Sequence, residues 1–305
     1  MSRTAFLFPG QGSQMVGMGK DFYDTFDWAK DIYEKASDIL GFDLSDISFN
    51  GPEEKLKQTV HTQPALFVHS YVAAQCFEQK SIKAIAAAGH SLGEFSALAY
   101  ARAFSFEEGL ELVRERACLM QNAGEKEPGS MAAIIGLTPE DVMDLCVEAR
   151  EKGIVQPANY NSTSQVVISG SIEGVDEAMS LAKGKGAKRV VKLPVSGAFH
   201  SPLMASAVVD FGKKIQQTDI QMGKIPVYAN VTSVPVSNVE EIRTLLHHQL
   251  THPVRWVETI QNMVKDGVDK FIEVGPGKVL SGLVKRIDRD AETAQCGTVA
   301  DLEKF

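Results

Sequence analysis

The stretch Gly89-His90-Ser91-Leu92-Gly93 decides the fold class of this 305-residue chain. It matches the Gly-x-Ser-x-Gly elbow, in which a serine stands on a tight turn between a buried strand and a helix. A run of mostly small residues at 83–88 precedes it and is interpreted as a strand, and helix-forming residues at 94–101 follow. Glycines flank the serine because so tight a turn leaves no room for side chains on both sides. The stretch predicts an α/β protein with a protruding serine hydroxyl.

Strands and helices alternate outward from this turn. The run at 5–8 ends at Pro9-Gly10 and reads as a buried strand entering a loop. Alternation of this kind predicts a mostly parallel sheet with helices on both faces. Further strands are expected at 226–231 and 270–274, and helices at 22–40, 63–77, 106–122, 239–250 and from 278.

A different order of elements occupies the middle of the chain. The sequence Thr138-Pro139-Glu140-Asp141 is a strong helix start, with a capping threonine, proline in the first turn and acidic residues behind it. Strands and helices there follow the order β-α-β-β-α-β, which is typical of a ferredoxin-like unit. We therefore predict a ferredoxin-like small subdomain at 128–193, inserted into a large subdomain formed by 1–127 and 194–305.

Composition and charge exclude several classes of protein. The net charge of −8 disfavours binding to nucleic acid or to an anionic membrane surface. The four cysteines form no Cys-x-x-Cys motif, so we expect free thiols in a reducing compartment rather than a disulfide framework or a zinc site. The apolar run at the N-terminus is too short for a signal peptide, and no stretch is long enough to span a bilayer. The expected location is the cytoplasm.

A serine hydroxyl needs a neighbouring base to act as a nucleophile. His200 is the strongest candidate, because it lies on the small-residue loop Gly197-Ala198-Phe199-His200-Ser201 at the predicted junction of the two subdomains. A purely structural loop histidine explains its position equally well at this point. His90 adjoins Ser91 in the turn, and we expect its side chain to point elsewhere. No acidic residue after Ser91 shows the signature of a triad, so the third member stays open.

Several motifs in one order carry a family resemblance over nearly the whole chain. The chain resembles malonyl-CoA:acyl-carrier-protein transacylases and the related acyltransferase domains of polyketide synthases. The motifs are Phe8-Pro9-Gly10-Gln11-Gly12-Ser13-Gln14, Gly89-His90-Ser91-Leu92-Gly93-Glu94, Arg116 with Leu119-Met120-Gln121, Asn159-Tyr160-Asn161, Gly197-Ala198-Phe199-His200-Ser201, Gln249 ahead of Pro253-Val254-Arg255-Trp256, and Glu273-Val274-Gly275-Pro276-Gly277.

The resemblance implies a fold and a set of catalytic roles. The fold would be an α/β-hydrolase-like core with a ferredoxin-like insert. Ser91 would be the nucleophile and His200 its base, with the backbone carbonyl of Gln249 orienting the imidazole in place of an acid. The backbone amides of Gln11 and Leu92 would form the oxyanion hole. The turn itself already directs the Leu92 amide to that place.

The resemblance also implies how the acyl group would be recognised. Arg116 would hold the free carboxylate of a malonyl group, because the planar guanidinium can bond both oxygens. Phe199 resembles the bulky residue of malonyl-selective members, whose ring would crowd an α-methyl branch. Asn159 would be a further substrate-binding residue. Without the resemblance, an ordinary helix-pairing charge would be the better interpretation of Arg116.

The implied reaction is transfer of malonyl from malonyl-CoA to the phosphopantetheine thiol of acyl carrier protein, in ping-pong fashion, for fatty acid synthesis. We expect no metal and no bound cofactor, since coenzyme A is a substrate. His248 and His252 are four residues apart, but no acid completes a metal site. Three alternatives stay open: a polyketide-pathway malonyltransferase, a thioesterase with the same serine and histidine, and a catalytically silent module that binds carrier proteins.

Two basic clusters stand out on this acidic chain, and either could dock an acidic carrier protein. The insert cluster comprises Lys183, Lys185, Lys188, Arg189 and Lys192; the C-terminal cluster comprises Lys285, Arg286 and Arg289.

Overall fold

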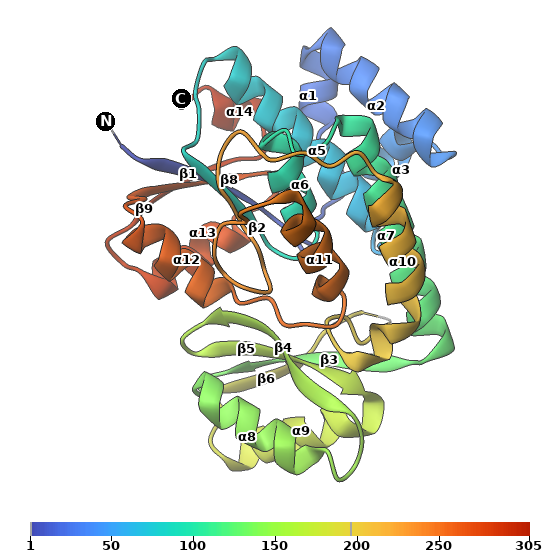
Figure 1. Ribbon diagram of the computed structural model, residues 1–305, viewed down its shortest axis with the longest axis vertical. Coiled ribbons are helices and arrows are strands. Elements are labelled where there is room, and N and C mark those ends of the chain that lie inside the picture. The colour runs from blue at the N-terminus through green and yellow to red at the C-terminus, as the bar shows by residue number, and fades with distance from the viewer. Residues whose placement is uncertain (1, 196) are drawn as a thin grey trace.

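Two sheets organise the computed structural model, which describes residues 2–195 and 197–305 (Figure 1). The larger sheet is parallel, with the strand order β7-β2-β1-β8-β9, and the smaller is antiparallel, with the order β4-β5-β3-β6. The strands are β1 Thr4–Phe8, β2 Ala86–Gly89, β3 Gly129–Ile135, β4 Val155–Ser162, β5 Gln165–Ser171, β6 Arg189–Lys192, β7 Val227–Tyr228, β8 Lys270–Val274 and β9 Glu292–Cys296.

Helices connect these strands and cover both faces of the parallel sheet. They are α1 Lys20–Thr25, α2 Asp27–Leu40, α3 Leu44–Asn50, α4 Glu53–Leu56, α5 Thr59–Gln79, α6 Gly93–Tyr100, α7 Phe106–Lys126, α8 Pro139–Ala149, α9 Ile172–Gly184, α10 Ala205–Gln217, α11 Val239–Gln249, α12 Trp256–Lys265, α13 Val279–Ile287 and α14 Val299–Leu302, with a short 3-10 helix at Pro202–Met204. Within the described part of the chain, no helix is both long and apolar enough to cross a membrane.

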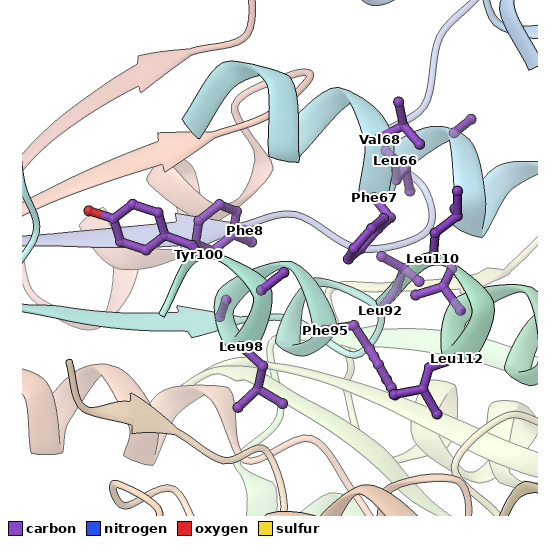
Figure 2. Close-up of a cluster of buried hydrophobic side chains, with 14 of the residues drawn as sticks. Phe8, Leu66, Phe67, Val68, Leu92, Phe95, Leu98, Tyr100, Leu110 and Leu112 are labelled. Carbon is purple, nitrogen blue, oxygen red and sulfur yellow. The ribbon is translucent and has the colours of Figure 1, made fainter. Parts of the chain in front are cut away.

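The central strand β1 shows why the parallel sheet is buried on both sides. Side chains alternate between the two faces of a strand. Ala5 and Leu7 therefore pack with α12 and α13, whereas Phe6 and Phe8 pack in the larger core with α5, α6 and α7. Figure 2 shows Phe8 in this larger core, together with Phe95 of α6 and other apolar side chains of the surrounding helices. A layer of helices on each face matches the near-continuous apolar sequence of a parallel strand.

The small sheet uses its two faces differently. Ile134 and Ile168 lie on the face that packs against α8 and α9 in a separate core. Met131, Ala133 and Val167 lie on the opposite face and join the core of the large sheet. The predicted α/β class and the predicted β-α-β-β-α-β order are confirmed, and the open face of the insert borders the large subdomain. The boundaries at 128 and 193 stay a prediction.

Three predicted elements differ from the structure. The helix predicted at 22–40 is two helices, because Phe26 has an extended backbone (φ −122°) between α1 and α2. The strand predicted at 226–231 is reduced to β7, because the chain turns back at Ala229, whose amide donates to Val234. The helix predicted at 63–77 begins four residues earlier, at Thr59, and accommodates Pro64 in its second turn.

The sequence pattern does not predict α10, α12 and β9, nor the short helices α3, α4 and α14. The first two are amphipathic helices, with Phe211 and Ile260 among their buried residues. The strand β9 is a half-exposed edge strand without a run of β-branched residues, so its own sequence gives little strand signal.

Candidate active site

The elbow turn is held open by glycines on both sides of the serine. Ser91 has a left-handed backbone (φ 52°), which places its side chain at the start of α6. A Cβ on Gly89 would lie 1.9 Å from the carbonyl carbon of Gly93. A Cβ on Gly93 would lie 2.0 Å from the carbonyl oxygen of Phe8. The turn therefore packs directly against the end of β1, and only glycine fits at these two positions.

The structure brings the predicted serine and histidine together. Ser91 Oγ lies 2.8 Å from His200 Nε2. The other ring nitrogen, Nδ1, lies 2.8 Å from the carbonyl oxygen of Gln249 and 3.2 Å from that of His252. A carbonyl oxygen can only accept, so Nδ1 carries the proton and Nε2 is free to accept the serine proton. No carboxylate of residues 2–195 or 197–305 takes part in this orientation of the imidazole.

The histidine loop is anchored by residues from distant parts of the chain. His200 also has a left-handed backbone (φ 59°). Gln156 of β4 donates from Nε2 to the carbonyl oxygen of His200 at 2.9 Å and to that of Thr251 at 3.2 Å. Ser201 donates to the carbonyl oxygen of Ala198 at 2.6 Å and caps the short helix that follows. The small sheet therefore helps to position the imidazole.

Arg116 is fully buried in α7 beside the serine. One terminal nitrogen donates to Ser91 Oγ at 3.0 Å and to Gln249 Oε1 at 2.9 Å, and the other donates to Gln63 Oε1 at 2.8 Å. The guanidinium carbon lies 5.4 Å from the centre of the Phe95 ring, within the range of a cation–π contact. A buried guanidinium with neutral acceptors is suited to pairing with an anion that enters from outside.

Three buried polar residues for which the sequence predicts no role complete the site. Asn230 accepts from the amide of Ser91 at 2.7 Å and donates to the carbonyl oxygen of Gly89 at 2.7 Å, so it clamps the elbow. Glu94 accepts from Gln249 Nε2 at 2.6 Å. Gln63 is the acceptor for Arg116 described above. Glu94 stands in the quoted motif, but Asn230 and Gln63 carry no local signal, because neighbours distant in sequence give them their contacts.

Burial controls the charges around the serine. It lowers the pKa of His200 to about 3, and the positive charge of Arg116 adds to that shift. Burial likewise lowers the pKa of Arg116 to about 9 and raises the pKa of Glu94 to about 7. At neutral pH the imidazole is thus neutral, as a base must be.

A cavity of about 100 Å³ opens at the serine. A cavity of this size suits a small acyl group. Arg116 and Gln249 lie behind this wall. Arg116 contacts Ser91, and Gln249 contacts His200. Within the described residues, the backbone amides of Gln11 and Leu92 donate to no protein acceptor. The wall consists of Gln11, Gln63, His90, Ser91, Leu92, Met120, Met131, Asn159, Leu193, Val195, Phe199 and His200.

His90 lines the same cavity, but its ring is engaged elsewhere. Its Nε2 lies 2.8 Å from Asn161 Oδ1, and its ring centre is 5.4 Å from that of Trp256. Burial lowers its pKa, so it is neutral as well. Across residues 2–195 and 197–305, no group of His, Cys, Asp and Glu side chains is arranged to hold a metal ion.

Comparison with known proteins gives one consistent result. The family model described as "Acyl transferase domain" matches residues 5–304. A malonyl CoA-acyl carrier protein transacylase of Bacillus subtilis is 43% identical over 96% of this chain and 93% of the relative. A solved transacylase of the same name from Coxiella burnetii superimposes with a TM-score of 0.96 at 41% identity, over 99% of this chain and 96% of the other.

One solved structure of a relative includes a partner. It is a malonyl-transacylase in complex with its type II PKS acyl-carrier protein, with a TM-score of 0.96 and 39% identity, over 99% of this chain and 98% of the other. The resemblance that the motifs indicate is confirmed over the whole length of the chain. The chain belongs to the acyl transferase family and is an acyltransferase.

Proposed function

We propose that this protein transfers the malonyl group of malonyl-CoA to the phosphopantetheine thiol of an acyl carrier protein, in fatty acid synthesis. The observation that carries the proposal is the buried Arg116, whose guanidinium lies 3.0 Å from Ser91 Oγ. If the acyl group on Ser91 bears a carboxylate, that carboxylate would pair with the Arg116 cation. An acetyl group would leave the cation unpaired.

In the proposed first half-reaction, Ser91 attacks the thioester carbonyl while His200 Nε2 takes the hydroxyl proton. The carbonyl oxygens of Gln249 and His252 keep the imidazole in the correct tautomer. The amides of Gln11 and Leu92 would stabilise the oxyanion, and their lack of protein acceptors supports this role. Coenzyme A leaves as the thiol and takes the proton from the imidazolium.

In the second half-reaction the carrier-protein thiol attacks malonyl-Ser91 by the same steps in reverse. The six residues named above, with Arg116, are proposed to suffice without a cofactor, and the cytoplasm is the proposed location. The free thiols of Cys76, Cys118, Cys146 and Cys296 support a reducing compartment.

Phe199 and Asn159 are proposed to shape the acyl site. Both are buried and line the cavity at the serine. Phe199 lines the cavity together with His200, so its ring would crowd a methyl branch on the acyl group. Replacing it by alanine is expected to raise methylmalonyl acylation relative to malonyl acylation by about tenfold. An unchanged ratio would contradict this role.

The C-terminal cluster is the better candidate for carrier-protein docking. Lys285 and Arg286 line a groove of about 650 Å³ with Lys278, and no carboxylate of the described residues pairs with them. Asn161, which binds His90 beside the serine, lies in the same groove. In the insert cluster, by contrast, Lys185 and Lys192 pair with Glu148 and Asp176, which neutralises part of the cluster.

Charge reversal tests the docking proposal. Arg286→Glu is expected to raise the KM for carrier protein about tenfold and to leave acylation by malonyl-CoA nearly unchanged. Arg189→Glu, in the insert cluster, is the matched control and should have a smaller effect. Equal effects, or transfer that is insensitive to salt, would contradict docking at the groove.

Intact-protein mass after mixing with malonyl-CoA tests the reaction itself. The expected result is one malonyl adduct on the wild type and none on Ser91→Ala, followed by loss of the adduct when carrier protein is added. Persistent labelling of Ser91→Ala would refute the assignment. Release of free malonate instead of malonyl-thiol would indicate the thioesterase, and no adduct on any variant would indicate the silent binding module.

A further inference from the structure

A buried carboxylate lies behind the site and outside the wall of the cavity. Glu94 stands in the first turn of α6, three residues after Ser91, and is 2% exposed. Its Oε2 accepts from Gln249 Nε2 at 2.6 Å and from the backbone amide of Asn230 at 3.2 Å. Glu94 therefore contacts both the clamp of the elbow and the residue that orients the imidazole.

These contacts fix which way the Gln249 side chain faces. Its Nε2 donates to Glu94 and, at 3.0 Å, to the carbonyl oxygen of Ser91, while its Oε1 accepts from Arg116. An amide nitrogen only donates and an amide oxygen only accepts, so the flipped amide would oppose acceptor to acceptor and donor to donor. The carboxylate thus makes Gln249 present its oxygen to Arg116.

Glu94 is also the counter-charge of Arg116. Arg116 makes no ion pair within 4.0 Å among the described residues, and the negative charge of Glu94 acts on it across the Gln249 amide. Arg116 of α7 is the charged side chain that acts on Glu94 in return. Gln249 of α11 and Asn230 after β7 face the carboxylate as neutral donors, and neither β1 nor β2 contains a titratable residue.

We propose that Glu94 is a positioning residue that sets the strength of the carboxylate clamp: it holds Arg116 in the empty enzyme through Gln249, and its ionised form weakens the binding of a carboxylate-bearing acyl group. The inference rests on the proposed function. Glu94 touches no substrate. When a malonyl carboxylate pairs with Arg116, a second negative charge enters a buried cluster that already holds one.

The sign of the pH dependence follows from this charge balance. Burial raises the pKa of Glu94 to about 7, so the group titrates between pH 6 and 8. Below that range Glu94 is neutral, Arg116 is unopposed, and the malonyl group binds more tightly; above it, Glu94 is ionised and the malonyl group binds more weakly. His200, with its pKa lowered to about 3, stays neutral throughout. Acetyl-CoA has the same nucleotide portion as malonyl-CoA but lacks the carboxylate. Dividing the malonyl KM by the acetyl KM therefore cancels the pH effects that the two substrates share.

The experiment measures the KM for acylation of Ser91 by malonyl-CoA and by acetyl-CoA from pH 6 to 8. In the wild type, the malonyl KM relative to the acetyl KM should rise by about threefold to tenfold with pH, because carboxylate binding and proton binding are linked. Glu94→Gln should abolish the rise and keep the low ratio. Both hydrogen bonds of Glu94 use one oxygen, which the glutamine oxygen can replace.

Glu273→Gln is the matched control. Glu273 is also fully buried, and burial raises its pKa, but it accepts from the amides of Leu280 and Ser281 at the start of α13. This variant should keep the wild-type rise. Thermal unfolding shows whether Glu94→Gln folds. If it does not, Glu94→Asp serves as the second test: it retains the charge and should keep a rise of the malonyl-to-acetyl KM ratio with pH.

Two results would overturn the inference. One is a flat malonyl-to-acetyl ratio in the wild type. The other is the same rise in folded Glu94→Gln as in the wild type, which would reduce Glu94 to a structural role. Failure of the proposed function looks different, because the wild type would then form no malonyl adduct at any pH.

Discussion

The elbow and the histidine loop solve one problem in two ways. Each holds its functional residue in a left-handed backbone, with φ 52° at Ser91 and 59° at His200. The elbow is shaped by its own glycines, packed against the adjacent end of β1, and Asn230 adds a clamp to a turn that the glycines already allow. The histidine loop is held by Gln156 of β4. Its imidazole is oriented by the carbonyl oxygens of Gln249 and His252.

This difference explains which loop the sequence discloses. A tight turn requires glycine at particular positions, so the spacing of the glycines in the sequence indicates the elbow. Hydrogen bonds from distant segments have no signature in the local sequence, so the sequence around His200 does not distinguish it from a structural loop histidine. Variants of the two loops should differ in the same way: changes to the elbow act on stability and activity together, and changes to the anchors of the other loop act mainly on activity.

The largest effect is expected when the base itself is removed. His200→Ala should lower the rate of malonyl-Ser91 formation about 1000-fold, because among the described residues no other neutral acceptor is hydrogen-bonded to Ser91 Oγ. His61→Ala, at a half-buried histidine of α5, is the control and should react like the wild type. Single-turnover labelling measures the rate. A loss of less than tenfold would mean that the elbow activates its serine without the second loop.

The next effect concerns the elbow. Gly93→Ala places a Cβ 2.0 Å from the carbonyl oxygen of Phe8, so the backbone must move. We expect a loss of about 2–3 kcal/mol in the free energy of unfolding and a rate about 100-fold lower. Denaturant unfolding and labelling rates measure the two.

Gly184→Ala is the control for this change. Nothing lies within 4 Å of a Cβ at Gly184, so the variant should be as stable as the wild type. A stable and active Gly93→Ala protein would show that the elbow tolerates side chains.

A smaller effect is expected at the anchor of the histidine loop. Gln156→Ala removes the donor to the carbonyl oxygens of His200 and Thr251. The rate of acylation should fall about tenfold through a misplaced imidazole, with a loss of only about 1 kcal/mol in stability. Comparing kcat/KM with thermal unfolding separates the two. A stability loss with an unchanged rate would show that other contacts hold the loop.

The smallest effect concerns pH: the rate constant for acylation should not change with it. The rate constant for acylation by bound acetyl-CoA should be flat from pH 5 to 8, because the pKa of His200 is lowered to about 3 by burial. Stability should respond at lower pH. The unfolded imidazole binds a proton near pH 6.5 and the folded one does not, so this group makes stability fall as the pH drops from 6.5 towards 3. A rate that falls with a midpoint near 6.5 would contradict a buried, neutral base.

Much of the architecture was predictable, since apolar periodicity and turn residues mark most strands and helices. The alanine-rich strand before the elbow was readable only from its position, because alanine favours helices. The break at Phe26 was not readable, because the apolar pattern continues across it. The strand β9 was not readable either, because its pairing with β8 supplies the strand geometry that its residues do not demand.

The sequence by itself determined the elbow, the order of the two subdomains and the family, because glycine spacing, periodicity and motif order are properties of the chain. Only the tertiary structure decided that Arg116 reaches the serine, that Gln249 links it to Glu94, and that Asn230 clamps the turn. These contacts join residues up to 155 positions apart. A buried hydrogen bond or charge acquires its partners, and therefore its pKa, only when the two sheets and their helices have packed.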